Sequence, residues 1–288
     1  MKTNLSQVLS KGAASATGSF NILDLDMAMS IIDCAEALNT PVIIGIASRH
    51  FNAVRAPVLV PSVLKAIESS NVPVALHLDH AGPNQIEMIK QALDLGFSSI
   101  MIDGSLLPLE ENIEVTAKVV ELSHRYNASV EGEIGGIAGE EGVADTEQDS
   151  PDYIPYTNPL EAQQFVKATR VDALAIAVGT AHGIYSSEPH INFDVIKEIQ
   201  SMVSTPLVMH GATGVSDASI QKAVSNGIRK INYFSGLLQT AMDEVRAYDS
   251  KGNDFLQFKH SMQEQWRKLI AEQIKLYAKL PENMYKQA

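Results

Sequence analysis

The sequence predicts a (β/α)8 barrel, the TIM-barrel fold, with a helical extension at its C-terminal end. Short apolar segments rich in β-branched residues alternate with longer segments of helical periodicity along the 288 residues. Several of the short segments are apolar throughout, as in strands of a parallel sheet that is covered on both faces. Eight such strands in one regular series favour a single closed barrel over two domains.

The predicted strands are the segments 18–22, 41–47, 72–78, 98–103, 128–134, 172–178, 205–210 and 228–234. Apolar residues at three- and four-residue spacing predict helices between them, over 24–38, 83–95 and 109–125. Pro83 suits the first turn of the second helix. Ser216 or Asp217 is the expected N-cap of a later helix that ends at Gly227.

We expect residues 1–288 to form one barrel domain, with one or two extra helices from about residue 254. The segment 135–157 is rich in Gly, Glu and Asp and has no helical period. A loop of this length inside a compact domain is usually functional or mobile.

The composition excludes several classes of partner. The net charge is −12 and there is no basic tract, which argues against nucleic acid and against an anionic membrane. There is neither a signal peptide nor an apolar run long enough for a membrane span, so we expect a cytoplasmic protein. The one cysteine, Cys34, lies in a predicted helix and is expected to be a buried, unreactive thiol.

Polar side chains gather where the predicted strands end, which is the face of a barrel that carries the chemistry. His80, His182 and His210 follow three different strands, and each is followed directly by glycine or alanine. A lone histidine at a strand end is more often a hydrogen-bonded polar residue. Three in register are typical of a catalytic zinc site that keeps one position open.

Two glycine-rich segments, 179–183 (GTAHG) and 210–214 (HGATG), follow the sixth and seventh predicted strands. Loops after the late strands of such barrels often bind a phosphate through backbone N–H groups. Ordinary strand-to-helix turns are the alternative reading.

The motifs HLDHAG, VEGEIG, DALAIAVGTAHGIY, LVMHGATGVSD and KINYFS, in this order, resemble the class II (zinc-dependent) ketose-bisphosphate aldolases. The resemblance covers nearly the whole chain and is greatest to the branch that contains tagatose-bisphosphate aldolase. It implies reversible cleavage of a ketose (bis)phosphate to dihydroxyacetone phosphate and an aldehyde, through an enediolate that zinc stabilises. The substrate stays open among tagatose 1,6-bisphosphate, fructose 1,6-bisphosphate and a related ketose 1-phosphate.

The resemblance also assigns roles to residues. It implies one Zn2+ ion held by His80, His182 and His210, with Glu133 as a nearby carboxylate that can take up the ion. Asp79 would protonate the aldehyde oxygen, and either Glu140 or Glu141 would be the base. The residues implied to bind substrate are Asn21, Ser48, Gly183, Gly211, Ala212, Thr213, Asn232, Tyr233, Phe234 and Ser235. A monovalent cation near the phosphate, and a homodimer or homotetramer, are further implications.

The end of the last strand departs from the family. Relatives commonly have Asp or Ala, then Thr, then an acidic residue where this chain has Phe234, Ser235 and Gly236. Ser235 keeps a hydroxyl for the phosphate, but the sugar is left in doubt. Arg49 and Arg55 either reach a second phosphate or are solvent-exposed charges.

Two other functions fit the sequence less well. A metal-dependent hydrolase usually takes a His-x-His pair from the first strand, whereas this strand ends in FNILD. A non-catalytic sugar-phosphate-binding barrel would have lost Asp79 or a metal ligand, and the sequence retains them.

Overall fold

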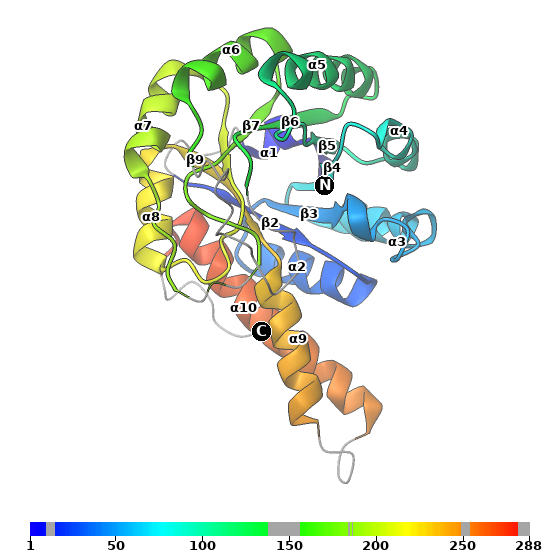
Figure 1. The fold of residues 1–288 in the computed structure, drawn as a ribbon. Coiled ribbons are helices and arrows are strands. Elements are labelled where there is room, and N and C mark those ends of the chain that lie inside the picture. The colour runs from blue at the N-terminus through cyan, green and yellow to red at the C-terminus, as the bar shows by residue number, and fades with distance from the viewer. Residues whose placement is uncertain (10–14, 138–155, 184, 186, 249–253, 282–288) are drawn as a thin grey trace.

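A computed structural model describes residues 1–9, 15–137, 156–183, 185, 187–248 and 254–281. Strands β2 to β9 form a closed parallel barrel in which β2 pairs with β9 and β4 pairs with β5 (Figure 1). The predicted (β/α)8 fold is confirmed. The barrel strands are β2 (Thr17–Asn21), β3 (Val42–Ala47), β4 (Val74–Ala81), β5 (Ser99–Ile102), β6 (Ser129–Ile134), β7 (Ala173–Ile176), β8 (Leu207–Met209) and β9 (Ile228–Tyr233).

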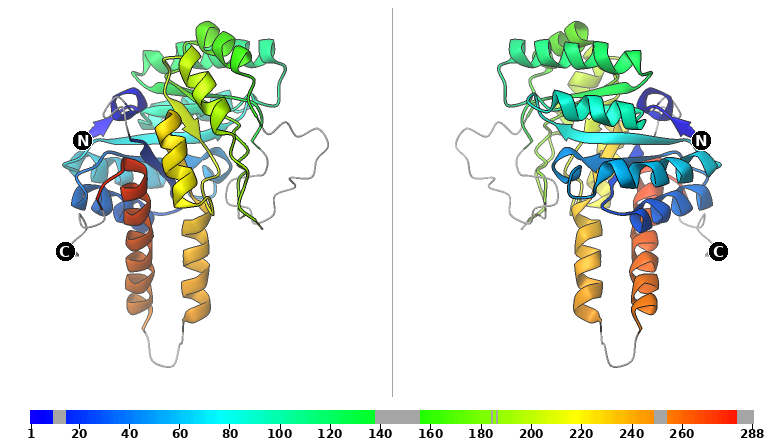
Figure 2. Two further views of the ribbon diagram at one scale, coloured as in Figure 1. Left: turned by 90° about the vertical axis from the view of Figure 1, so that its left-hand side faces the viewer. Right: turned by 90° about the vertical axis from the view of Figure 1, so that its right-hand side faces the viewer.

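Helices cover the outside of the barrel. They are α2 (Leu25–Ala37), α3 (Ala56–Ser69), α4 (Ile86–Leu95), α5 (Leu109–Arg125), α6 (Pro159–Thr169), α7 (Phe193–Met202) and α8 (Asp217–Asn226), whereas α9 (Ser235–Ala247) projects beyond the barrel (Figure 2). A short 3-10 helix, η1 (Ser48–His50), follows β3. Ser216 is the N-cap of α8 and Gly227 ends it, as predicted. The prediction for Pro83 was wrong, because residues 82–85 form a turn in which Gln85 Oε1 accepts from Gly82 N–H, and α4 begins at Ile86.

The C-terminal extension is a single helix within the described residues, α10 (Phe255–Ala278), capped by Asp254. Its C-terminal half packs on the barrel through Trp266, Ile270 and Tyr277, and its N-terminal half extends beside α9 beyond the barrel (Figure 2). Cys34 of α2 faces α10, where its thiol donates to the Arg267 carbonyl. Burial raises the pKa of this thiol to about 12, as expected for an unreactive cysteine.

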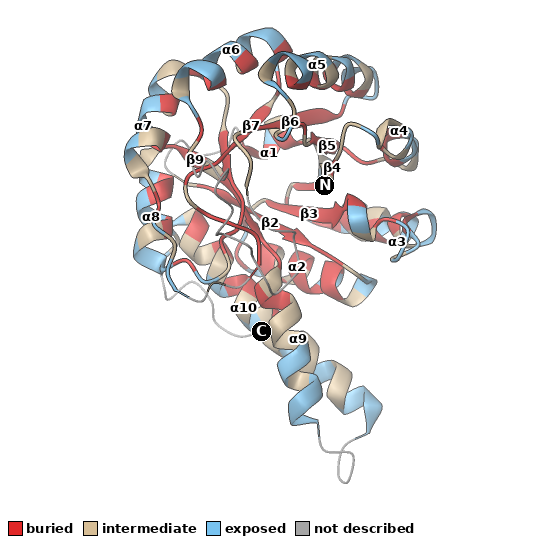
Figure 3. Cartoon of the chain, in the orientation of Figure 1, coloured by how far each residue is buried: buried red, intermediate tan, exposed pale blue. Residues whose placement is uncertain are grey.

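The core has two parts. The larger part fills the space between the strands and the helices (Figure 3). The smaller part lies inside the barrel, where Ile43, Met101 and Val208 meet side chains of the short helix α1 (Leu5–Leu9). Helix α1 follows β1 (Lys2–Thr3), which pairs with β4, and neither element was predicted. Since one end of the barrel is closed by apolar residues, the polar residues gather at the other end, where the strands finish.

Among the described residues, no helix is both long enough and apolar enough to cross a membrane.

Candidate active site

A β-bulge in β4 aims His80 into the barrel mouth. Successive residues of a strand point to opposite faces, so Asp79 and His80 would normally diverge. Between Leu78 and Ala81, however, β4 carries one extra residue relative to β5. His80 sits in the bulge with φ of 50°, a left-handed conformation that histidine adopts more readily than most residues. The Ser48 hydroxyl donates to the His80 carbonyl and so supports the bulge.

The three histidines of the sequence pattern meet at the barrel mouth. The ligand-capable nitrogens of His80, His182 and His210 all lie within 4.8 Å of one another. The ring centroid of His80 lies 4.7 Å from that of His182 and 4.6 Å from that of His210. His80 lies within β4 and His210 directly follows β8, so the sheet sets the positions of both, whereas His182 lies in the loop that follows β7.

Carboxylates fix how two of these rings present their nitrogens. His80 Nδ1 lies 3.0 Å from Asp103 Oδ2, and His210 Nε2 lies 2.8 Å from Glu131 Oε1. An ionised carboxylate only accepts hydrogen bonds, so these two nitrogens carry the hydrogens. The opposite nitrogens, His80 Nε2 and His210 Nδ1, then face one another across 3.0 Å. Two lone pairs at this distance favour a cation between them.

The pKa shifts agree with a preference for positive charge at this point. Burial lowers the pKa of His80, but the Asp79 and Asp103 carboxylates outweigh it and raise the pKa well above the usual value. Burial, together with the charge of His80, lowers the pKa of His210 to about 4. Both shifts favour positive charge on His80 over His210.

A second cluster shares His80. The ligand-capable atoms of His80, Asp103 and Glu133 also lie within 4.8 Å of one another. Glu133 is buried, and its Oε2 atom has no hydrogen-bond partner among the described residues. Burial, with the nearby Asp103 carboxylate, raises the pKa of Glu133 well above its usual value. A buried carboxyl with a free oxygen is suited to receive a metal ion.

Asp79 is clamped by two amide side chains. Asn21 Nδ2 donates to Asp79 Oδ2 at 2.8 Å, and Asn232 Nδ2 donates to Asp79 Oδ1 at 3.1 Å. His77 Nε2 lies 3.5 Å from Asp79 Oδ1. Burial opposes ionisation, yet the charge of His80 and the contact with His77 hold the pKa of Asp79 well below its usual value. Gly45 makes this arrangement possible, because a Cβ there would lie 2.0 Å from Asn21 Oδ1.

The two glycine-rich segments lie against each other. Gly211 has φ of 69°, and a Cβ on it would lie 2.2 Å from the Ala181 carbonyl oxygen, so only glycine fits. The Tyr185 hydroxyl accepts from Ala181 N–H and lies 2.7 Å from the carbonyl oxygens of Ala181 and Gly211. This tyrosine therefore ties together the two loops that carry His182 and His210.

A cavity of about 10 Å³ lies beside the histidines, enough for about one water molecule. Its lining residues are His182, Gly183, Gly211, Ala212, Thr213, Asn232, Phe234 and Ser235. Helix α9 begins at Ser235 against this cavity, and in its first turn the Gly236 N–H donates to Thr213 Oγ1 at 3.3 Å. A phosphate group would fit only after the surrounding side chains or loops move.

Several residues implied by the resemblance lie elsewhere. Tyr233 points away from the barrel interior, packing edge-on against Phe20 at 6.4 Å between ring centroids. Its hydroxyl fills the space beside Gly236, where a Cβ would lie 2.2 Å from it. A side chain at this position would clash with the tyrosine. Arg49 and Arg55 are solvent-exposed.

Glu140 and Glu141 lie outside the described residues, so the structure gives no position for them.

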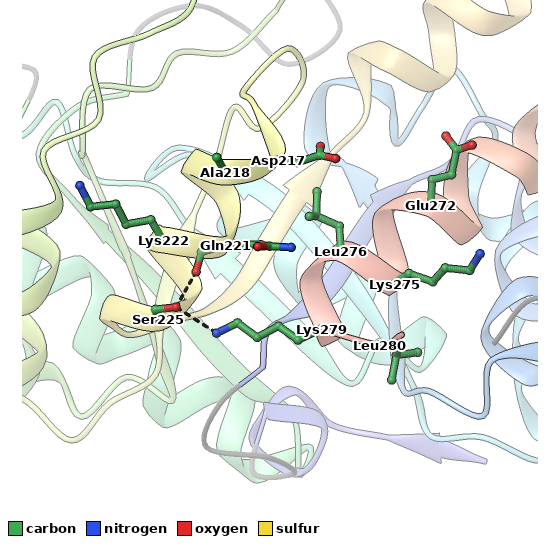
Figure 4. Close-up of a pocket in the computed structure, with 10 residues that line it drawn as sticks. All are labelled: Asp217, Ala218, Gln221, Lys222, Ser225, Glu272, Lys275, Leu276, Lys279 and Leu280. Carbon is green, nitrogen blue, oxygen red and sulfur yellow. Dashed lines mark hydrogen bonds between the residues drawn. The ribbon is translucent and has the colours of Figure 1, made fainter. Parts of the chain in front are cut away.

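A larger groove, about 750 Å³, lies between α8 and α10 on the outside of the barrel (Figure 4). Lys279 donates to Ser225 across it, and Lys222 stacks on Phe193 at 4.0 Å from the ring centroid. This groove is not the active site despite its size, because its lining residues come from α8, α10 and the two residues after α10, and none lies at the C-terminal end of a strand.

Four further residues of the site have roles that were not predicted. Asp103 and Glu131 orient the histidines, His77 contacts Asp79, and Lys230 is buried beside Glu131. A signal existed for Glu131, which is two residues before Glu133 in VEGEI and therefore on the same face of the strand.

Comparisons with known proteins identify the family of this chain. The family description "Fructose-bisphosphate aldolase class-II" matches residues 3–280. The chain therefore belongs to the class II fructose-bisphosphate aldolase family, a family of aldolases. Fructose-bisphosphate aldolase of Staphylococcus epidermidis (strain RP62A) is 39% identical over 222 residues, covering 75% of this chain and 74% of the relative.

Protein YdjI of Escherichia coli K12 is 37% identical to this chain over 262 residues, or 91% of each sequence. The crystal structure described as the YdjI aldolase superposes with a TM-score of 0.84 at 33% identity, covering 96% of this chain and 97% of that one.

Proposed function

We propose that this protein is a zinc-dependent class II aldolase that reversibly cleaves a ketose (bis)phosphate to dihydroxyacetone phosphate and an aldehyde. The observation that carries the proposal is the meeting of His80, His182 and His210 beside the buried carboxylate Asp79. Neither a binding protein nor a structural barrel needs three converging imidazoles next to a clamped acid.

The donor set fits a zinc ion. His80, His182 and His210 would hold it, and Glu133 offers a carboxylate 4.0 Å from His80 Nδ1 for a second position. Carboxylates on the outer nitrogens of His80 and His210 are the usual support for metal-binding imidazoles. When bound, the ion supplies Lewis-acid stabilisation of the negative charge that develops on the substrate oxygens.

Asp79 would move the proton of the reaction. In the cleavage direction the C4 hydroxyl must lose its proton as the C3–C4 bond breaks, and in the reverse direction the aldehyde oxygen must gain one. A carboxylate held ionised by its neighbours is ready to accept the first proton. Asn21 and Asn232 hold it in one orientation through both of its oxygens.

Backbone groups would bind the phosphate of dihydroxyacetone phosphate. Gly183, Gly211 and the N-terminus of α9 converge on one cavity, and Ser235 adds a hydroxyl. N–H groups at a helix N-terminus attract anions because of their partial positive charge. A monovalent cation near the phosphate remains part of the proposal, as does the assignment of the second base to Glu140 or Glu141.

Condensation of dihydroxyacetone phosphate with a panel of aldehydes, phosphorylated and not, tests the proposal. We expect product with at least one sugar aldehyde, abolished by a chelator and restored by zinc. The accepted aldehyde decides between a fructose- or tagatose-type bisphosphate and a ketose 1-phosphate. Metal-loaded protein that binds dihydroxyacetone phosphate but condenses it with no aldehyde would indicate a non-catalytic sugar-phosphate-binding barrel instead.

We also infer a homodimer or homotetramer. Helices α9 and α10 extend beyond the barrel (Figure 2), and their projecting ends expose Val245, Phe255 and Leu256. Phe255 is 69% exposed and Leu256 is 60% exposed. A second copy of the chain would cover this apolar tip.

A further inference from the structure

The barrel contains a buried ion pair directly behind the histidines. Lys230 of β9 and Glu131 of β6 are both fully buried, and Lys230 Nζ lies 2.8 Å from Glu131 Oε2. The same amine donates a 2.7 Å hydrogen bond to Asn232 Oδ1. Lys230 and Asn232 are two residues apart on one strand, so both side chains point into the barrel.

Stability does not account for this pair. Removing two charges from water costs several kcal/mol per ion, and apolar residues of similar volume are often at least as stabilising. The barrel shows that such packing is available here, because Val208, the Cα partner of Lys230 on β8, belongs to an apolar cluster. The role of the ion pair therefore lies in the groups that it contacts.

One contact of Lys230 leads to Asp79. The Asn232 amide has one acceptor atom and one donor group. Because Oδ1 accepts from Lys230, Nδ2 must face the opposite way, where it donates to Asp79 Oδ1 at 3.1 Å. Without the lysine the amide could rotate and turn its oxygen toward the carboxylate, which would release Asp79 from one side of its clamp.

The other contact leads to His210. Lys230 occupies Oε2 of Glu131, so Oε1 is the atom that accepts from His210 Nε2 at 2.8 Å. This hydrogen bond places the His210 hydrogen on Nε2 and leaves Nδ1 free to face His80. The orientation of a metal-binding imidazole is set in this way by the partner of its other nitrogen.

We propose that Lys230 is a positioning residue that orients both the proton-transferring carboxylate Asp79, through Asn232, and the metal ligand His210, through Glu131. One amine thus couples the geometry of the acid to that of the metal site. The role of Lys230 in orienting Asp79 rests on the proposed aldolase function. Its role in orienting His210 rests only on the histidine cluster.

The test compares Lys230→Met with Lys118→Met. Lys118 is 69% exposed on α5 and pairs with Glu114 at 2.6 Å, so the control removes an ion-paired lysine without touching the barrel. For Lys230→Met we expect zinc to dissociate about 10- to 100-fold more readily, as for other losses of support behind a metal ligand. We expect kcat to fall about 100-fold, because a misplaced catalytic group has an effect of this size.

The Michaelis constant separates positioning from general damage. Lys230 contacts Glu131 and Asn232 and none of the groups proposed to bind the phosphate, so we expect the KM for the ketose phosphate to stay within about twofold as kcat falls. The control variant should match the wild type in zinc affinity, kcat and KM.

Lys230→Met leaves Glu131 buried without its partner and could prevent folding. A Lys230→Met, Glu131→Gln double variant removes both charges, and its glutamine oxygen can still accept from His210. We expect this variant to fold, to recover zinc affinity close to the wild-type value, and to keep the low kcat because Asn232 still lacks its donor.

The inference would be overturned if Lys230→Met, or the folded double variant, had both the zinc affinity and the kcat of the wild-type protein. If the wild-type enzyme itself shows no aldolase activity, the proposed function fails, and the zinc affinity of Lys230→Met against its control still decides the metal part.

Discussion

His80 Nε2 lies 3.0 Å from His210 Nδ1, while the opposite nitrogen of each ring is held by a carboxylate, Asp103 or Glu131. The two imidazoles are therefore presented to each other with lone pairs inward. His182 completes the cluster from the loop after β7. Such an arrangement is stabilised by a proton or a metal ion, and it explains why His80 attracts positive charge.

Replacing the cluster histidines one at a time should remove the metal. We expect His80→Ala, His182→Ala and His210→Ala each to lower bound zinc from about one equivalent to well below it, because each removes one of three protein ligands. Metal analysis of the dialysed proteins measures this. His260→Ala, an exposed histidine on α10, is the matched control and should keep its zinc. Full retention by all three cluster variants would refute the site.

Removing the charge of Asp79 should block bond cleavage without releasing the metal. Asp79→Asn keeps the size of the side chain but cannot accept the C4 proton, so we expect kcat to fall by about 10²- to 10⁴-fold. Zinc content should be unchanged, because Asp79 is not a member of the cluster. Asp94→Asn, on the exposed surface of α4, controls for loss of a carboxylate. A variant with near-normal kcat would assign the proton transfer elsewhere.

Gly211 should tolerate no side chain. In Gly211→Ala the new Cβ would lie 2.2 Å from the Ala181 carbonyl oxygen at φ of 69°, so backbone must move. The left-handed conformation alone costs about 1–2 kcal/mol, and we expect the free energy of unfolding in urea to fall by at least about that amount. Gly82→Ala meets only the flexible end of Asn84 at 3.2 Å and should cost much less. Equal stability of the two variants would contradict this account of the loop.

The apolar tip of α9 and α10 should hold the oligomer together. We expect the wild-type protein to sediment as a dimer or tetramer and the Val245→Asp, Leu256→Asp variant to sediment as a smaller species. Leu160→Asp, at an apolar position 68% exposed on α6, should leave the assembly intact. Sedimentation equilibrium measures the mass of each assembly, and a monomeric wild-type protein would contradict the inferred homodimer or homotetramer.

The barrel was predictable because its strands are short apolar runs with long amphipathic segments between them. Each of the eight predicted strands overlaps an observed barrel strand. Strand β1 and helix α1 were not predicted, since two and five residues are too short to show a period. Pro83 was misplaced because a side chain, Gln85, closes the turn before α4, and no periodicity records such a contact.

The convergence of the histidines was also predictable, because parallel strands of a barrel end on one face. The partners behind them were not. The contacts of Glu131 with His210 and with Lys230 join strands that do not pair with one another, so they depend on the curvature of the closed barrel. The Tyr185 hydroxyl is similar, since it acts through backbone groups of two loops that only the fold brings together.

The central claim is that a metal ion on these histidines activates dihydroxyacetone phosphate, and proton exchange tests it without knowledge of the aldehyde. The protein is incubated with dihydroxyacetone phosphate in D2O, with zinc or with a chelator, and the carbon-bound protons are followed by NMR. We expect one proton to exchange in the zinc-loaded protein, the rate to collapse with chelator, and exchange to persist in Asp79→Asn. Absence of exchange in protein shown to hold one zinc ion would contradict the account.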